Sequence, residues 1–190
     1  MTTALLLIDI QNDYFPGGKM ALERMDEAGA GARNLLEAFR TRGLPVLHIR
    51  HLSTRPGATF FVPGTPGADI NPLVTPEAGE KVIDKSFPNS FRGTPLADEL
   101  RSAGIDSLVI AGAMSHMCVD ATVRAAFDLG FRCIVAEDAC ATRALEFNGA
   151  TIPAREVHTV DAVTESRVYS FSLSQAQQGD AILVLAPLAA

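Results

Sequence analysis

Cys118 is the residue whose type and position in this chain most favour chemistry. It lies where a buried apolar run at 107–111 has given way to a small-residue turn, and an amphipathic stretch at 119–129 follows it. This order predicts a strand, a tight turn and a helix that begins at a thiol. Backbone N–H groups at a helix start carry partial positive charge, which would stabilise a thiolate or an oxyanion formed when sulfur attacks a carbonyl.

A carboxylate, Asp9, directly follows the first apolar run at 4–8. Ligands of an open α/β sheet bind beyond the carboxyl ends of its strands, so Asp9 and Cys118 are expected to share one edge. A base next to a cysteine is the arrangement that activates a thiol nucleophile. The alternatives are a turn-capping Asp9 and a buried structural Cys118.

The elements that must position these residues follow from the apolar pattern. Continuous runs rich in Val, Ile and Leu at 4–8, 45–49, 107–111 and 133–136 are typical of strands buried on both faces. Helical patterns lie at 26–42, 94–104 and 119–129. We therefore expect a doubly wound, three-layer α/β/α fold with a mostly parallel central sheet. Near the end of the chain we expect one helical turn at 153–157 and a strand at 181–185, and we assign nothing to 159–179.

Residues 51–80 interrupt this alternation. The segment contains prolines at 56, 63, 66, 72 and 76 and glycines at 57, 64, 67 and 79, so it is expected to form a long loop. Loops of this length in a compact domain are usually functional or disordered. The apolar stretch at 58–62 favours a lid or the wall of a pocket.

Composition restricts the class of protein. The 190 residues, with 47% hydrophobic side chains, fit a single domain over 1–190, and a net charge of -6 without a basic stripe argues against a nucleic-acid partner. The first residues carry no basic leader, and no apolar run reaches the ~18–20 residues of a membrane span. Three cysteines, at 118, 133 and 140, fit neither a disulfide framework nor a zinc pattern. We expect a cytoplasmic protein with reduced thiols and no membrane partner.

Three motifs occur in an order that is specific to one family. They are Asp-Ile-Gln-Asn-Asp-Tyr at 9–14, Ile-Asp-Lys-Ser-Phe-Pro-Asn-Ser-Phe at 83–91, and Gly-Ala-Met-Ser-His-Met-Cys-Val-Asp-Ala-Thr at 112–122. Over residues 4–158 the chain resembles the isochorismatase-like cysteine hydrolase superfamily, which includes nicotinamidases and N-carbamoylsarcosine amidohydrolase.

The resemblance implies a catalytic triad of Asp9, Lys85 and Cys118. It also implies a cis peptide bond just before Met114, with the amides of Met114 and Cys118 as the oxyanion hole. The expected reaction is hydrolysis of a C–N bond in a small amide, ureide or lactam through a thioester, without a cofactor. A homo-oligomer, either a dimer or a tetramer, is expected.

Departures from the family narrow this expectation. A nicotinamidase-type metal site needs an Asp and several histidines after the second strand, but only His48 and His51 lie there, and His48 falls inside the predicted strand. We therefore expect no metal. Isochorismatases proper lack the nucleophilic cysteine, so Cys118 argues against vinyl ether hydrolysis.

Other classes of function stay open at this point. They are a non-amide hydrolase on the same fold, a thiol redox protein that uses Cys118 with Cys140, and a nucleotide- or flavin-binding module. The last lacks a glycine-rich phosphate motif after the first strand.

Six side chains are candidates for substrate contact, and each has a structural alternative as a core aromatic or a hydrogen-bonded polar residue. They are Gln11, Tyr14, His51, Phe60, Phe91 and His116. Cys133 is expected to be buried filler. Cys140 follows a predicted strand and could approach the site.

Overall fold

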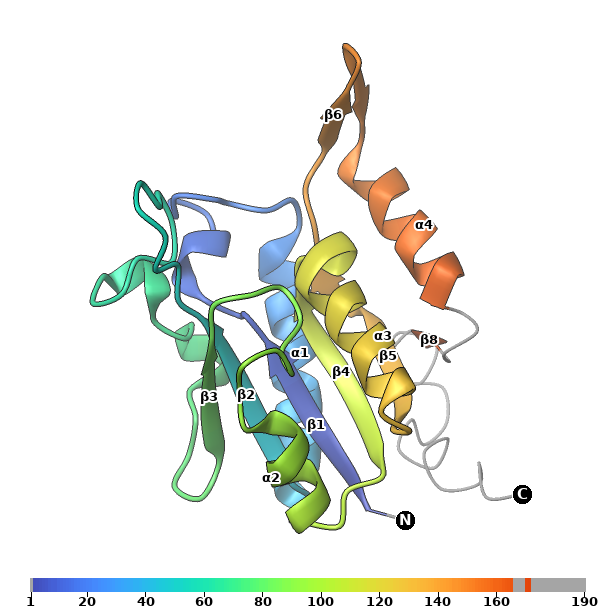
Figure 1. Ribbon diagram of the computed structural model, residues 1–190. Helices are drawn as coiled ribbons and strands as arrows, with labels where there is room; N and C mark the ends of the chain where they lie inside the picture. Colours follow the sequence, from blue (N-terminus) through green and yellow to red (C-terminus); the bar gives the residue numbers. More distant parts are fainter. Residues whose placement is uncertain (1, 166–169, 172–190) are drawn as a thin grey trace.

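A six-stranded sheet in the order β3-β2-β1-β4-β5-β8 forms the centre of the protein, and every neighbouring pair in it is parallel. The computed structural model describes residues 2–165, 170 and 171 (Figure 1). Its sheet consists of β1 (Thr3–Ile8), β2 (Val46–His51), β3 (Lys81–Lys85), β4 (Ser107–Ala113), β5 (Arg132–Ala141) and β8 (Ser170–Phe171). The helices are α1 (Met25–Thr41), α2 (Leu96–Ser102), α3 (Asp120–Asp128) and α4 (Ala154–Glu165).

Helices cover both faces of the sheet, so the predicted three-layer fold is confirmed (Figure 1). Side chains of β1 alternate between two cores: Leu5 and Leu7 pack in the cluster that includes α1, and Leu6 and Ile8 in the cluster that includes α2 and α3. Both faces of β1 are therefore buried, which explains its continuous apolar sequence. Each fully buried Leu or Ile contributes about 1.5–3 kcal/mol relative to an exposed one.

The direction of winding changes between β1 and β4, and this places two strand ends side by side. From β1 the chain proceeds to β2 and β3 on one side, whereas β4 and β5 lie on the other. Ile8 at the end of β1 pairs with Gly112 in β4. Gly112 has a φ of +139°, and a Cβ on it would lie 2.0 Å from the carbonyl oxygen of Ile8, so only glycine fits there. This close approach puts Asp9 beside the turn that follows β4.

The predicted strands at 4–8, 45–49 and 107–111 are confirmed, and the one at 133–136 is longer than predicted. β5 continues to Ala141 past Glu137 and Asp138, with an irregular register opposite Ile110 and Gly112. β3 was not predicted, because this edge strand alternates exposed and buried positions and carries two lysines and an aspartate in five residues. The helices expected at 26–42 and 94–104 correspond to α1 and α2.

The helix expected to begin at Cys118 is organised differently. A five-residue π-helical turn, Ser115–Val119, precedes α3, and Cys118 lies inside it. We name residues 113–119 the oxyanion turn, after the role that the family resemblance implies for it. The prediction of a thiol as the first helical residue was therefore wrong by about one turn.

Beyond β5 the chain forms a two-stranded antiparallel hairpin, β6 (Leu145–Phe147) and β7 (Ala150–Ile152), which projects away from the sheet (Figure 1). The single turn expected at 153–157 is the start of the 12-residue α4. β8 falls in the stretch to which the sequence gave no assignment, and the strand expected at 181–185 lies outside the described residues. Among the described helices, none has the length and apolar character needed to cross a bilayer.

Candidate active site

The fold brings Asp9, Lys85 and Cys118 together at the carboxyl edge of the sheet. Asp9 follows β1, Lys85 ends β3, and Cys118 comes from the oxyanion turn after β4. All three are at least 97% buried. Lys85 Nζ lies 2.8 Å from Asp9 Oδ2, so the two form a buried ion pair. Side-chain atoms of Asp9, His51 and Cys118 all lie within 4.8 Å of one another.

Lys85 is held as an ammonium ion. It donates a hydrogen bond to the carbonyl of Pro88 at 2.8 Å as well as pairing with Asp9. Burial alone would lower the pKa of Lys85, but the neighbouring Asp9 and Cys118 outweigh this and raise it. Apart from Lys85 and the thiol of Cys118, the Asp9 oxygens have no hydrogen-bond donor among the residues that the structure describes. The carboxylate is therefore open to a proton from the thiol.

The thiol of Cys118 rests in its neutral form. Burial raises its pKa well above the usual range, the negative charge of Asp9 raises it further, and Lys85 only partly opposes these effects. The prediction of a stabilised thiolate at a helix start is therefore wrong. Removal from water and the adjacent carboxylate both raise the pKa of the thiol and so disfavour the thiolate. Such a thiol must lose its proton as it attacks, and Asp9 is the carboxylate in contact with it.

The oxyanion turn has the backbone geometry that the family resemblance implies. The peptide bond between Ala113 and Met114 is cis. The carbonyl of Met114 accepts hydrogen bonds from the N–H groups of Met117 and Val119, at 3.1 and 3.2 Å. These bonds close the turn that carries Cys118. The role of the Met114 and Cys118 amides as oxyanion donors stays a prediction.

His51 lies beside the reacting groups. Its Nδ1 is 3.9 Å from Cys118 Sγ and 3.9 Å from Asp9 Oδ2. Burial is the largest influence on its pKa and lowers it, so the ring is neutral at pH 7. A neutral imidazole at this position offers a substrate one donor or acceptor.

The side chain of Gln11 is hydrogen-bonded to the backbone of His51. Gln11 is fully buried, and its side chain exchanges two hydrogen bonds with the His51 backbone, at 2.9 and 2.7 Å. A third bond at 2.8 Å reaches the carbonyl of Ala68 in the long loop. Both ends of the Gln11 amide are engaged in these bonds, so Gln11 fixes the end of β2 to the loop. The amide makes these internal bonds in place of the predicted substrate contact.

The loop at 52–80 forms an aromatic wall against the site. The backbone N–H of Phe61 donates to Asp13 at 2.6 Å, which fixes the loop to the segment after β1. The ring of Phe61 packs on Tyr14, Phe60 and His51, with centroids 4.5, 5.1 and 5.9 Å away. Burial raises the pKa of Tyr14, and the nearby Cys118 and Asp9 raise it further, so Tyr14 borders the reacting groups. Phe61 lies in the apolar stretch at 58–62 that was predicted to form a lid or the wall of a pocket.

Phe91 and His116 differ in their relation to the site. Phe91 stacks on Phe131, which precedes β5 and therefore lies toward the opposite end of the strands. Phe91 also packs against the core cluster that includes Cys118, and its contact with substrate stays a prediction. His116, in the oxyanion turn, bonds through Nδ1 to the hydroxyl of Thr142 at 2.6 Å.

Arg143 is a cation near the site that the sequence did not reveal. Burial lowers the pKa of His116, and the positive charge of Arg143 lowers it further, so this guanidinium lies near the oxyanion turn. The same charge acts on Tyr14. Arg143 is exposed. Its only signal in the sequence is a basic residue after a strand, and the strand predicted at 133–136 ended five residues before the end of β5 at Ala141.

The residues at this edge do not fit a metal ion. Asp9, His51 and Cys118 present one oxygen, nitrogen and sulfur atom close together. The ammonium of Lys85 already pairs with Asp9 at 2.8 Å and would repel a divalent ion. His48 lies buried within β2 with Nε2 2.9 Å from Glu80 Oε2, so it faces a different partner.

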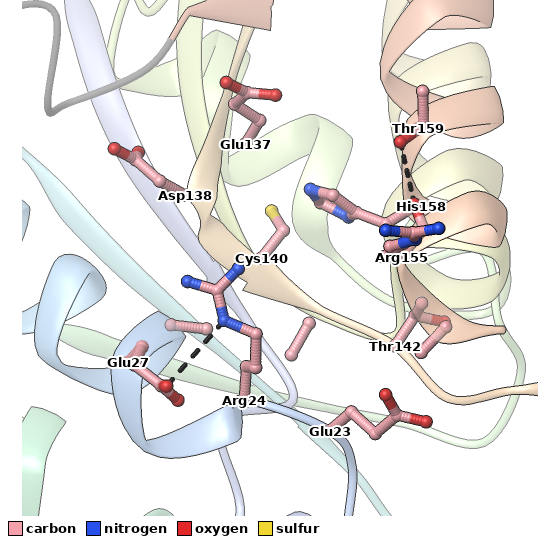
Figure 2. Close-up of a pocket in the computed structure, with 13 residues that line it drawn as sticks. Glu23, Arg24, Glu27, Glu137, Asp138, Cys140, Thr142, Arg155, His158 and Thr159 are labelled. Atoms are coloured by element: carbon pink, nitrogen blue, oxygen red, sulfur yellow. Dashed lines mark hydrogen bonds and ion pairs between the residues drawn. The ribbon is translucent and has the colours of Figure 1, made fainter.

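A pocket of about 350 Å³ lies between the start of α1, the end of β5 and α4 (Figure 2). Cys140 and His158 line it together with acidic and basic side chains from all three elements. Cys140 thus faces this pocket, and no disulfide joins any of Cys118, Cys133 and Cys140.

Comparison with known proteins identifies relatives along most of the chain. The isochorismatase domain model matches residues 3–164. The chain is 48% identical to the isochorismatase family protein YddQ of Bacillus subtilis, over 90% of this chain and 94% of that protein. A crystal structure described as an isochorismatase hydrolase from Oleispira antarctica has a TM-score of 0.89 and 49% identity, covering 94% of this chain and 97% of that one.

Two further relatives carry names that state an activity. Streptothricin hydrolase of Streptomyces noursei is 37% identical over 73% of this chain and 54% of that protein. Maleamate amidohydrolase of Pseudomonas putida is 32% identical over 74% of this chain and 72% of that protein.

Proposed function

Because the chain belongs to the isochorismatase family of hydrolases, we propose that it hydrolyses a C–N bond in a small amide, ureide or lactam, with Cys118 as the nucleophile. One observation carries the proposal. A thiol, a carboxylate and an ammonium group are buried together, and Lys85 pairs with Asp9 at 2.8 Å. Maleamate amidohydrolase among the relatives supports a C–N bond as the target.

In the proposed reaction, Cys118 Sγ attacks the substrate carbonyl carbon as its proton passes to Asp9. The carbonyl oxygen becomes an oxyanion that accepts hydrogen bonds from the Met114 and Cys118 amides. Asp9 then returns the proton to the departing nitrogen, the C–N bond breaks, and ammonia or an amine leaves a thioester on Cys118. Asp9 next takes a proton from the water that attacks the thioester carbon. As the C–S bond breaks, Asp9 returns this proton to Cys118 Sγ, so the acid leaves and the thiol is restored.

Lys85 keeps this sequence of proton transfers possible. Its charge offsets the cost of a buried carboxylate before the thiol proton arrives. It also opposes the rise in the thiol pKa that burial and Asp9 cause. Lys85 therefore favours the negative charge wherever it lies, on Asp9 or on sulfur.

Arg143 supports a substrate with an acidic group. It is an exposed cation whose charge reaches Tyr14, which borders the reacting groups, and His116 of the oxyanion turn. Guanidinium groups bind carboxylates through paired hydrogen bonds. An Arg143→Gln variant should raise KM for an amide that carries a carboxylate and leave KM for its neutral methyl ester unchanged; equal effects on both would refute this assignment.

We also propose that the protein works as a homo-oligomer, a dimer or a tetramer. The hairpin β6–β7 projects from the body (Figure 1). Phe147 and Ile152 in this hairpin and Val160 in α4 are exposed. Isolated two-stranded hairpins are marginally stable, so a covering surface would stabilise this one. Light scattering during gel filtration would test this, and a monomer at micromolar concentration would contradict it.

The proposed reaction is tested by ammonia release from a panel of small amides, ureides and lactams, with Cys118→Ala as the blank. Lactams release no ammonia, so ring opening is followed by mass. Ester substrates are included, because the same thiol could also hydrolyse a C–O bond. Ester cleavage without amide cleavage would favour the non-amide alternative.

A further inference from the structure

One hydrogen bond links α4 to the oxyanion turn. His158 Nδ1 lies 2.8 Å from the hydroxyl oxygen of Ser115. Ser115 directly follows Met114 and is 96% buried. Its hydroxyl also lies 3.3 Å from the carbonyl of Ala141 at the end of β5. The Ser115 hydroxyl thus lies between the Ala141 carbonyl of β5 and the His158 ring of α4.

The neutral ring of His158 matches both of its partners. The ring also forms a hydrogen bond with the backbone of Glu137, and Nδ1 faces Ser115, so this second bond falls to Nε2. A carbonyl can only accept, so Nε2 carries the proton and Nδ1 is an acceptor. The single hydroxyl proton of Ser115 faces two acceptors, His158 Nδ1 at 2.8 Å and the Ala141 carbonyl at 3.3 Å, and the shorter distance favours donation to Nδ1. Burial is the largest influence on the pKa of His158 and lowers it, which favours this neutral form.

The place of Ser115 makes this bond relevant to catalysis. It lies between Met114 and Cys118, the residues whose N–H groups are proposed to receive the oxyanion. Such donors act only when they lie within about 2.7–3.1 Å of the oxygen, so a small movement of the turn weakens them. The partners of His158 within the described residues are Ser115 and the Glu137 backbone rather than the triad, so His158 would act through Ser115.

We propose that His158 is a positioning residue, which holds Ser115 and thereby fixes the two proposed oxyanion donors. The inference rests on the proposed function. The oxyanion exists only at and after the attack, so this role affects kcat far more than KM. Removing an entire oxyanion donor typically costs 10²–10³ in kcat, so loss of its alignment should cost about 10- to 100-fold.

His158 is also a suitable position for substitution. It is half-buried and borders the 350 Å³ pocket, where Figure 2 shows its ring pointing from α4 toward Cys140 on β5. A shorter side chain there opens space into an existing pocket and leaves no closed cavity in the core. The cost in stability should therefore be small.

Two amide substitutions separate the two ends of the ring. In His158→Asn the amide lies near the position of Nδ1 and can keep the bond to Ser115. In His158→Gln it lies near the position of Nε2, so Ser115 loses its partner on α4. Thr159→Ala is the matched control, because within the described part of the chain the hydroxyl of this exposed neighbour bonds to the Arg155 carbonyl at 2.7 Å and not to Ser115.

We expect His158→Gln to lower kcat by about 10- to 100-fold with KM within twofold of wild type, and His158→Asn and Thr159→Ala to stay within about threefold. Ser115→Ala should lose as much as His158→Gln, and the double variant no more than either. Ser115→Ala also serves as the test if His158→Gln does not fold. The positioning role would be overturned by a wild-type kcat in Ser115→Ala or in folded His158→Gln. It would also be overturned if His158→Asn and His158→Gln lost kcat equally.

The Cys118→Ala blank separates this result from failure of the proposed function. If wild type and Cys118→Ala release product equally, the proposed function is wrong, and the positioning role falls with it. If Cys118→Ala is inactive but His158→Gln is not impaired, only the positioning role is wrong.

Discussion

Replacing Asp9 by Asn should change thiol reactivity and turnover in opposite directions. The substitution keeps the shape of the side chain and removes its charge. In the protein, burial and Asp9 both raise the pKa of Cys118, while Lys85 opposes them. Asp9→Asn therefore removes one of the two effects that disfavour the thiolate and leaves Lys85 as its counter-ion.

The distance between the groups sets the size of the effect. An Asp9 oxygen and Cys118 Sγ lie within 4.8 Å, and two unit charges at that separation repel by about 3.5 kcal/mol at an effective dielectric constant of ~20. This corresponds to about a 300-fold change in thiolate population. Thiolates become less nucleophilic as their pKa falls, so alkylation should accelerate by only about 10- to 30-fold.

Turnover should fall in the same variant, because Asn can neither take the thiol proton nor return it to the leaving nitrogen. Loss of a general acid–base group typically costs 10²–10⁴ in rate. The assay is the pH dependence of iodoacetamide labelling at Cys118, read by peptide mass, beside ammonia release. Lys85→Met is the matched control, since it removes the opposing charge and should slow labelling. A variant Asp9→Asn that labels no faster than wild type and turns over normally would refute the reasoning.

Three further predictions follow from the charges of the protein. Lys85→Met leaves Asp9 buried without its counter-ion, so the free energy of unfolding should fall by about 3–5 kcal/mol, or Tm by roughly 6–20 °C. Adding Asp9→Asn should restore most of the lost stability. An unchanged free energy in urea unfolding and an unchanged Tm would contradict the ion pair. Burial alone would raise the pKa of Glu80, but bonds from Arg40, the Glu77 backbone and His48 lower it to about 2. Because the folded-state pKa is depressed, the stabilising effect of Glu80 is present above pH 4.5 and lost toward pH 2. The difference in free energy of unfolding between wild type and Glu80→Gln, measured in urea, should therefore become smaller as the pH falls over that interval. A difference that does not change with pH would contradict this. Dialysis against EDTA should leave hydrolysis unchanged, and recovery of a lost activity with zinc or manganese would show that a metal is needed.

The sequence was most informative where a residue's environment is set by its neighbours along the chain. The runs at 4–8 and 107–111 are apolar because both faces of β1 and β4 are covered, and this pattern is visible without coordinates. Asp9 follows directly from the end of β1. β3 was missed because it is an edge strand with charged residues on its exposed face, so its apolar pattern is weak.

Features that depend on contacts across the fold were not accessible. The pKa of Cys118 depends on burial and on Asp9, which lies 109 positions earlier in the chain. The bond between Ser115 and His158 joins residues 43 positions apart. Gln11 was taken for a substrate contact because its motif surrounds the site, but hydrogen bonds to His51 and Ala68 turn it inward. Such outcomes are decided by tertiary packing, which local sequence patterns do not encode.

The central claim is that Cys118 carries the acyl group of the substrate during turnover. The most direct measurement is intact-protein and peptide mass spectrometry of a reaction quenched with acid within milliseconds, using an amide that the protein hydrolyses. The account predicts an adduct equal to the substrate mass less ammonia on the peptide that contains Cys118, and neither adduct nor turnover in Cys118→Ala. Turnover in Cys118→Ala at the wild-type rate, or an adduct confined to Cys133 or Cys140, would contradict it.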